Sequence, residues 1–98
     1  MVKYALLARL EVKPGKEQDV ENLLKGALQL AEEEQETVSW YALKIGPSTY
    51  GVFDTFNSED GRQAHLTGRI AAALMQHAGE LLSAPPVIEM VDLLAVKV

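Results

Sequence analysis

Apolar and polar residues alternate in the segments at both ends of the chain, and in both segments the alternation is incomplete. In residues 4–12, one set of alternate positions is apolar throughout, while the other begins with Ala5 and Leu7 before it turns polar at Arg9. In residues 87–98, both series of alternate positions carry mostly apolar side chains. Because successive side chains of a strand point to opposite faces, both segments are predicted to be strands with two largely apolar faces.

Two segments between these strands show the spacing of amphipathic helices. The first begins after the turn at Pro14 and ends near the acidic run 32–34, which is interpreted as a solvated face at the unfavourable end of the helix dipole. The second begins with Ser58 as N-cap, kinks at Gly68 and ends before the prolines 85–86. The two apolar stripes comprise Val20, Leu23, Leu24, Ala27, Leu28 and Ala31, and Ile70, Ala73, Leu74, His77 and Leu81.

The middle of the chain is predicted to form a β-hairpin. Residues 37–45 and 49–56 are rich in aromatic and β-branched residues, and the turn 46–48 (Gly-Pro-Ser) separates them. The order strand, helix, strand, strand, helix, strand predicts one α+β domain over residues 1–98, with a ferredoxin-like βαββαβ fold and an antiparallel sheet. One layer of helices covers only one face, so the apolar second face predicts a homodimer through sheet-to-sheet packing.

Composition narrows the partners that the chain is expected to bind. Nine Lys and Arg stand against 14 Asp and Glu, with a net charge of -5 and no basic cluster, which argues against nucleic acid and anionic membranes. There is no cysteine, which excludes disulfides and thiolate metal sites. The first apolar run is too short to span a membrane and lacks a signal-peptide pattern, so a cytoplasmic protein is expected.

Several segments carry a resemblance to a known family. They are residues 38–41 (Val-Ser-Trp-Tyr), 50–56 (Tyr-Gly-Val-Phe-Asp-Thr-Phe), 64–66 (Ala-His-Leu), 12–16 (Val-Lys-Pro-Gly-Lys) and 85–95 at the C-terminal end. Together they resemble the antibiotic biosynthesis monooxygenase superfamily over nearly the whole chain. The resemblance implies a dimeric α/β barrel, in which two ferredoxin-like sheets pack face to face. It also implies a mixed set of activities: some members oxidise polycyclic phenols or quinols with molecular oxygen and without metal or flavin, others degrade haem or isomerise small metabolites, and others have no known reaction.

The sequence departs from the usual family pattern at two places. Many relatives carry Pro-Gly before the second strand, where this chain has residues 35–37 (Gln-Glu-Thr). Many also carry a second histidine near a proline, whereas residues 67–70 here are Thr-Gly-Arg-Ile and the next histidine is His77. The family role of that second histidine is therefore not transferred to His77, which is interpreted as a half-buried packing residue.

His65 and Asp54 are the candidate catalytic residues. His65 matches the family histidine, and its near-neutral pKa would let it take a proton from a phenol or hydroquinone, leaving an anion that reacts with oxygen. The alternative is a histidine that ties a helix to the sheet. Asp54 could orient His65, but a structural pairing with Arg9 or Arg62 is the favoured interpretation.

Trp40 and Tyr50 are the candidate substrate-binding residues, because aromatic side chains on strands could stack on a flat ring. The alternative is that both belong to the core or to a dimer interface. The sequence contains no HxxxH, HExxH, Walker or dinucleotide-binding pattern, so neither a metal nor a cofactor is expected.

Three functional hypotheses follow from these observations. The first is a cofactor-independent monooxygenase acting on a small aromatic or quinol-type molecule, with His65 as base and Trp40 and Tyr50 lining the pocket. The second is a non-catalytic dimer that binds small molecules, in which His65 and Asp54 serve only the fold. The third is haem binding or degradation, which would require an imidazole facing iron in an apolar cleft.

Overall fold

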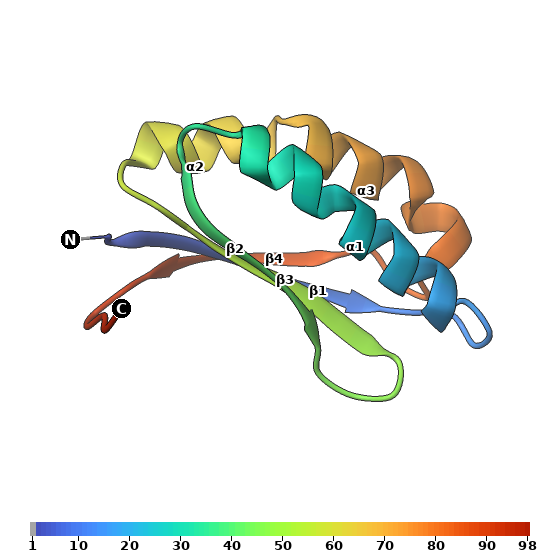
Figure 1. The fold of residues 1–98 in the computed structure, drawn as a ribbon. Coiled ribbons are helices and arrows are strands. Elements are labelled where there is room, and N and C mark those ends of the chain that lie inside the picture. The colour runs from blue at the N-terminus through green and yellow to red at the C-terminus, as the bar shows by residue number, and fades with distance from the viewer. Residues whose placement is uncertain (1) are drawn as a thin grey trace.

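The computed structural model describes residues 2–98 and consists of an antiparallel sheet with its helices on one face (Figure 1). The strand order in the sheet is β2-β3-β1-β4, and all three pairings are antiparallel. This is the ferredoxin-like arrangement that the sequence predicts. The elements in chain order are β1 (Tyr4–Glu11), α1 (Glu17–Glu33), β2 (Thr37–Lys44), β3 (Thr49–Phe56), α2 (Glu59–Leu66), α3 (Arg69–Leu81) and β4 (Val87–Asp92).

Most boundaries agree with the sequence pattern, and two differ from it. The predicted kink at Gly68 is a complete break, because Gly68 takes an extended conformation and serves as the N-cap of α3. The final strand ends at Asp92, so residues 93–98, which are apolar except for Lys97, do not continue it as predicted. Ser58 caps α2 as expected, with its Oγ accepting a hydrogen bond from the Gly61 backbone N–H at 3.0 Å.

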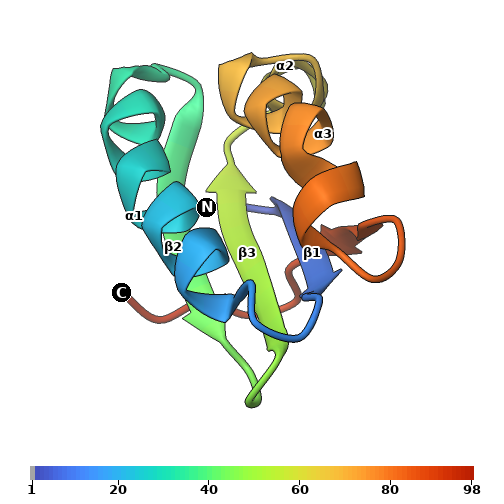
Figure 2. The ribbon, with the colours of Figure 1, turned by 90° about the vertical axis from the view of Figure 1, so that its right-hand side faces the viewer.

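The core lies between the sheet and the helices. Figure 2 shows α1 and α3 next to each other across the same face of the sheet, and the two helices are in contact. The Trp40 side chain packs against both groups of core residues and so joins α1 and α3 to β2. The larger group comprises Leu10, Val12, Val20, Leu24, Tyr50, Val52, Leu81 and Leu82, and the smaller comprises Ala27, Ala31 and Ile70.

The opposite face of the sheet, which we call the open face, has no helix over it (Figure 1). Tyr41 and Val87 are 53% and 56% exposed, and the rings of Tyr41 and Phe53 stack with their centroids 6.3 Å apart. At Gly51 a β-carbon would lie 2.8 Å from the Ala8 carbonyl oxygen, so only glycine fits without a shift of the backbone. The open face is thus mainly apolar at its centre and uncovered in the single chain.

Candidate functional site

Strand β3 brings two polar side chains to the helix-covered face, one near each end. Tyr50 and Asp54 share this face with Val52 and Phe56, because alternate residues of a strand point the same way. Both are buried, with Tyr50 2% and Asp54 1% exposed. The two ends of β3 therefore define two separate places at which chemistry could occur.

At the Asp54 end, one imidazole bridges two carboxylates. His65 on α2 places its Nε2 2.7 Å from Asp54 Oδ2 and its Nδ1 2.7 Å from Glu34 Oε1. The His65 ring lies against Phe56, with ring centroids 5.4 Å apart. We call this arrangement the Asp54–His65–Glu34 cluster.

The two carboxylates determine the charge of His65. Burial alone would lower the pKa of His65, but the hydrogen bonds and negative charges of Asp54 and Glu34 outweigh it and raise the pKa above the ordinary value of 6.5. The imidazolium form donates from both ring nitrogens, which matches the two short contacts. In this arrangement neither nitrogen of His65 is free to accept a proton from a ligand.

Asp54 is paired with His65 and not with an arginine. The pairing with Arg9 or Arg62, which was favoured from the sequence, is therefore wrong. Arg62 instead forms ion pairs with Glu59 and Asp92 and donates to the carbonyl oxygens of Ala5 and Val91. The physical reason is that α2 places Arg62 over the N-terminal end of β1 and His65 over Asp54.

Three buried polar atoms at this end have no hydrogen-bond partner among residues 2–98. They are Oδ1 of Asp54, Nε1 of Trp40 and Nε of Arg62, whose guanidinium is bonded through its other nitrogens. Trp40 and Asp54 are direct partners across the β2–β3 pairing, so their side chains start from neighbouring points on the same face. Buried polar groups are usually bonded, so an acceptor and a donor left free on adjacent strands indicate a place where a ligand could bond.

A small apolar cavity lies against the cluster. Its volume is about 50 Å³, and Asp54 and His65 are the charged residues in its lining. Neither Trp40 nor Tyr50 lines it, so the four predicted site residues do not share one pocket. A benzene ring occupies a cavity on the order of 150 Å³, so this one would have to widen to admit a ring. The apolar lining comes from the sheet and from the two short helices: Leu6, Ala8, Val52, Leu66, Ile70, Ala71, Leu74 and Ile88.

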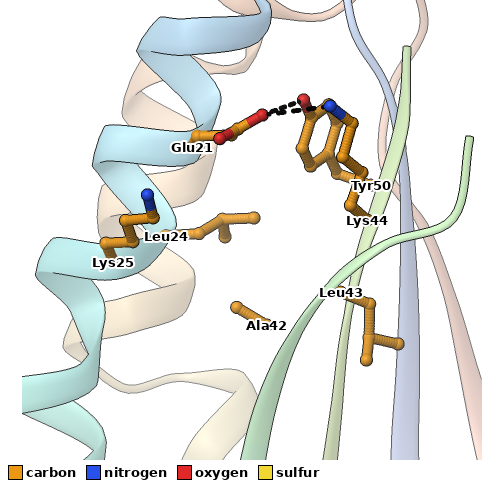
Figure 3. A pocket seen from close by; sticks show the side chains of 7 residues that line it. All are labelled: Glu21, Leu24, Lys25, Ala42, Leu43, Lys44 and Tyr50. Atoms are coloured by element: carbon orange, nitrogen blue, oxygen red, sulfur yellow. Dashed lines mark hydrogen bonds and ion pairs between the residues drawn. The ribbon is translucent and has the colours of Figure 1, made fainter. Parts of the chain in front are cut away.

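The Tyr50 end has a different character (Figure 3). The Tyr50 hydroxyl donates to Glu21 Oε2 at 2.6 Å, and Lys44 Nζ lies 3.4 Å from the same oxygen. The hydrogen bond from Tyr50 lowers the pKa of Glu21, and the same bond raises the pKa of Tyr50. A hollow of about 180 Å³ lies beside these groups, with Leu24 and Ala42 facing each other across it.

Glu34 is the site residue that the sequence did not reveal. It belongs to the acidic run interpreted as a solvated face, yet its carboxylate accepts from both His65 Nδ1 and Thr37 Oγ1. No local pattern connects it with His65, which is 31 positions away. His77 is half-buried beside core residues of α3, as predicted.

Residues 2–98 lack both a metal-binding cluster and a helix suited to span a membrane. No group of three or more histidine, aspartate or glutamate side chains is arranged to hold a metal ion. None of the helices in this range is both long and apolar enough for a bilayer crossing.

Comparison with known proteins gives matches among solved structures. No protein-family model and no curated protein sequence matches the chain. A crystal structure of a protein of unknown function from Nitrosomonas europaea is 59% identical, with a TM-score of 0.97, over 100% of this chain and 95% of that one.

Two more distant structures carry a functional description, given provisionally, as antibiotic biosynthesis monooxygenases. The one from Nitrosomonas europaea is 12% identical, with a TM-score of 0.83, over 94% of this chain and 99% of that one. The one from Caulobacter crescentus is 22% identical, with a TM-score of 0.79, over 96% and 92%. At these identities the likeness concerns the fold.

Proposed function

Since the chain belongs to the same family as the Nitrosomonas europaea protein of unknown function and has the antibiotic biosynthesis monooxygenase-like fold, we propose that it is a cofactor-independent monooxygenase. Its substrate would be a small phenol, enol or quinol that enters at the Asp54 end of β3. The observation that carries this proposal is the free Oδ1 of the buried Asp54, beside an apolar cavity and with Oδ2 held by His65.

In this proposal Asp54 replaces His65 as the proton acceptor. The substrate O–H donates to Oδ1, the O–H bond breaks, and the proton passes to the carboxylate while the electron pair stays on the substrate. His65 keeps the carboxylate oriented through Oδ2. Trp40 Nε1 also lacks a partner, but Trp40 does not line this cavity, so no contact with the substrate is assigned to it.

The electrons for the reaction come from the substrate itself. With an anthrone as substrate, deprotonated at the O–H of its enol form, and molecular oxygen as co-reactant, the CH₂ carbon of the keto form becomes a carbonyl, one oxygen atom enters the product and the other leaves as water. The protein would supply binding, deprotonation and exclusion of bulk water. The apolar lining of the cavity supports this role, because an anion there is poorly hydrated and therefore reactive.

The cavity must open for a ring to enter, and its wall allows movement at one side. Ile88, in the lining, is 44% exposed and lies on the edge strand β4. The Cα atoms of α3 and β4 are more than 8 Å apart throughout the described part of the chain, as is usual for a helix packed on a sheet, so side chains fill the space between the two elements. A ligand could therefore displace side chains between α3 and β4 without breaking backbone hydrogen bonds.

The test is oxygen uptake with an anthrone, in the wild type, in Asp54→Asn and in the matched control Tyr50→Phe at the other end of β3. We expect uptake above the buffer rate in the wild type, a loss of at least about tenfold in Asp54→Asn, because general-base catalysis is worth that much or more, and no loss in Tyr50→Phe. Equal rates in buffer and wild type would overturn the proposal.

A non-catalytic small-molecule-binding dimer is the second candidate, and the cavity of about 50 Å³ favours it. In that case the Asp54–His65–Glu34 cluster serves the fold, and Asp54→Asn changes stability without changing the binding of flat ligands. Haem ligation by His65 is not proposed, because both ring nitrogens are hydrogen-bonded to carboxylates.

We also propose that the chain forms a homodimer through its open face. The support is that Tyr41 and Val87 are exposed on that face, while the helices of the chain all cover the other face. A second copy would remove this apolar surface from water. Sedimentation at micromolar concentration tests this, and a stable single chain would contradict it.

A further inference from the structure

We infer that Glu34 is a positioning residue, which holds His65 as a doubly hydrogen-bonded imidazolium with Nε2 directed at Asp54. This inference rests on the proposed function of Asp54 and deepens it, because it identifies what fixes the geometry of the proton acceptor. The contacts of Glu34, the space made for its carboxylate and the charges around His65 support it independently.

Glu34 holds His65 from the side opposite Asp54. It is the C-cap residue of α1, with its own N–H bonded to the Ala31 carbonyl, so its backbone is fixed by the helix end. Its Oε1 accepts from His65 Nδ1 and from Thr37 Oγ1, both at 2.7 Å. Two donors on one oxygen fix the carboxylate, and an ordered acceptor at Nδ1 determines which nitrogen faces Asp54.

The break between α2 and α3 makes room for this carboxylate. A β-carbon at Gly68 would lie 3.3 Å from Glu34 Oε2 and 3.3 Å from the carbonyl oxygens of Ala64 and His65. Each of these separations is tighter than ordinary contact. A side chain at position 68 would therefore press on the glutamate as well as on the end of α2.

The charges around His65 come from four parts of the chain. Asp54 lies on β3 and Glu34 at the end of α1, and each touches one ring nitrogen. Glu36 and Arg69 share the outer groove with His65, and Arg69 itself pairs with Glu33 at 3.3 Å. Two carboxylates therefore act directly on one imidazole, so removing either should make the imidazolium less favourable.

His65 separates two spaces that differ in polarity. It lines both the apolar cavity of about 50 Å³ and an outer groove of about 280 Å³ that contains Glu34 and Arg69. The side chain of Glu34 is 22% exposed, whereas those of His65 and Asp54 are 8% and 2% exposed. Glu34 is thus the member of the cluster in contact with solvent, and it holds the imidazole from there.

The test is a pH titration of the His65 ring nitrogens by ¹⁵N NMR in the wild type and Glu34→Gln, with Glu32→Gln as control on the same helix. We expect two protonated nitrogens in the wild type at pH 6, which lies below the raised pKa of His65. In Glu34→Gln the titration midpoint should fall by about one unit or more, because a charge in direct contact shifts a pKa by that amount. Glu32→Gln should match the wild type.

A variant that keeps the negative charge distinguishes the effect of that charge on the pKa of His65 from a general change in the structure. Glu34→Asp retains the carboxylate on a shorter side chain, so its midpoint should lie between those of the wild type and Glu34→Gln. An unchanged midpoint in Glu34→Gln would overturn the inference. Oxygen uptake is measured separately, so an inactive wild type with a shifted Glu34→Gln midpoint would overturn the proposed reaction and leave the role of Glu34 in holding the imidazolium.

Discussion

The two ends of β3 present polar groups to the same helix layer, and they differ in whether those groups are satisfied. At the Tyr50 end, the hydroxyl, the Glu21 carboxylate and the Lys44 ammonium bond to one another. At the Asp54 end, His65 bonds to two carboxylates, yet Oδ1 of Asp54 and Nε1 of Trp40 have no partner among residues 2–98.

A buried polar group whose hydrogen bonds are all made within the protein only stabilises the fold. A buried polar group with an unused hydrogen-bonding position could also bind a ligand. Burial alone does not separate them, because Tyr50 and Asp54 are equally inaccessible. Cavity size does not separate them either, since each end has a hollow, of about 180 Å³ beside Tyr50 and of about 280 Å³ on the outer side of His65. The unused hydrogen-bonding capacity of a buried charged group is the more informative property. Such a group lowers the stability of the protein because it has lost its water, and a ligand that bonds to it would remove that penalty.

The largest expected effect is at the Asp54 end. His65→Ala leaves two carboxylates without their common donor, and breaking a buried ion pair costs about 3–5 kcal/mol of unfolding free energy. Urea denaturation at pH 7 measures it, with His77→Ala as the control for losing a half-buried histidine that makes no such contact. A loss in His65→Ala no larger than in His77→Ala would show that the cluster does not stabilise the fold.

The pH dependence of stability should also come from the Asp54 end. The pKa of His65 is raised above its ordinary value of 6.5 in the folded chain. The stabilisation is therefore complete below about pH 6.5 and is lost as the pH rises through the folded-state pKa. Melting temperatures measured from pH 6 to pH 9 should fall in the wild type more than in His65→Ala, and parallel curves would contradict this.

A smaller effect is expected at the Tyr50 end. Tyr50→Phe removes the hydrogen bond to Glu21, which is worth about 1 kcal/mol because the carboxylate can regain water. Denaturation together with oxygen uptake checks this, since the variant should lose stability and keep any activity. A loss of activity as large as that in Asp54→Asn would remove the distinction between the two ends.

The smallest effect is expected for Lys44→Gln. The Lys44 side chain is 58% exposed, and an exposed ion pair contributes about 0–1 kcal/mol. Its contribution should diminish further in 0.5 M salt, in which exposed charges are screened. A large loss of stability would mean that the Glu21–Tyr50 bond depends on the lysine.

The sequence pattern predicted the fold well because the fold depends on periodicity and turn residues. The second strand of the hairpin, residues 49–56, and the N-cap at Ser58 are local features, and both lie where expected. The site was predicted only in part. The face of Asp54 followed from alternation with Val52, but its partner depended on how α2 is rotated over the sheet, which no local pattern specifies.

Residues from distant segments were the hardest to predict. Glu34 reaches His65 because the C-terminal ends of α1 and α2 meet, and the sequence shows only an acidic helix end. Tyr50 was predicted to line the His65 pocket because an aromatic side chain on a strand could stack on a flat ring, yet four residues along β3 separate it from Asp54 and it does not line the cavity. The grouping of these side chains is a tertiary property.

The uncovered open face, with Tyr41 against Phe53, has a thermodynamic consequence. If a second copy covers it, folding and association become one linked equilibrium, so the melting temperature should rise with protein concentration. Dilution would then act as a denaturant, and every stability difference between variants would need to be compared at one fixed chain concentration.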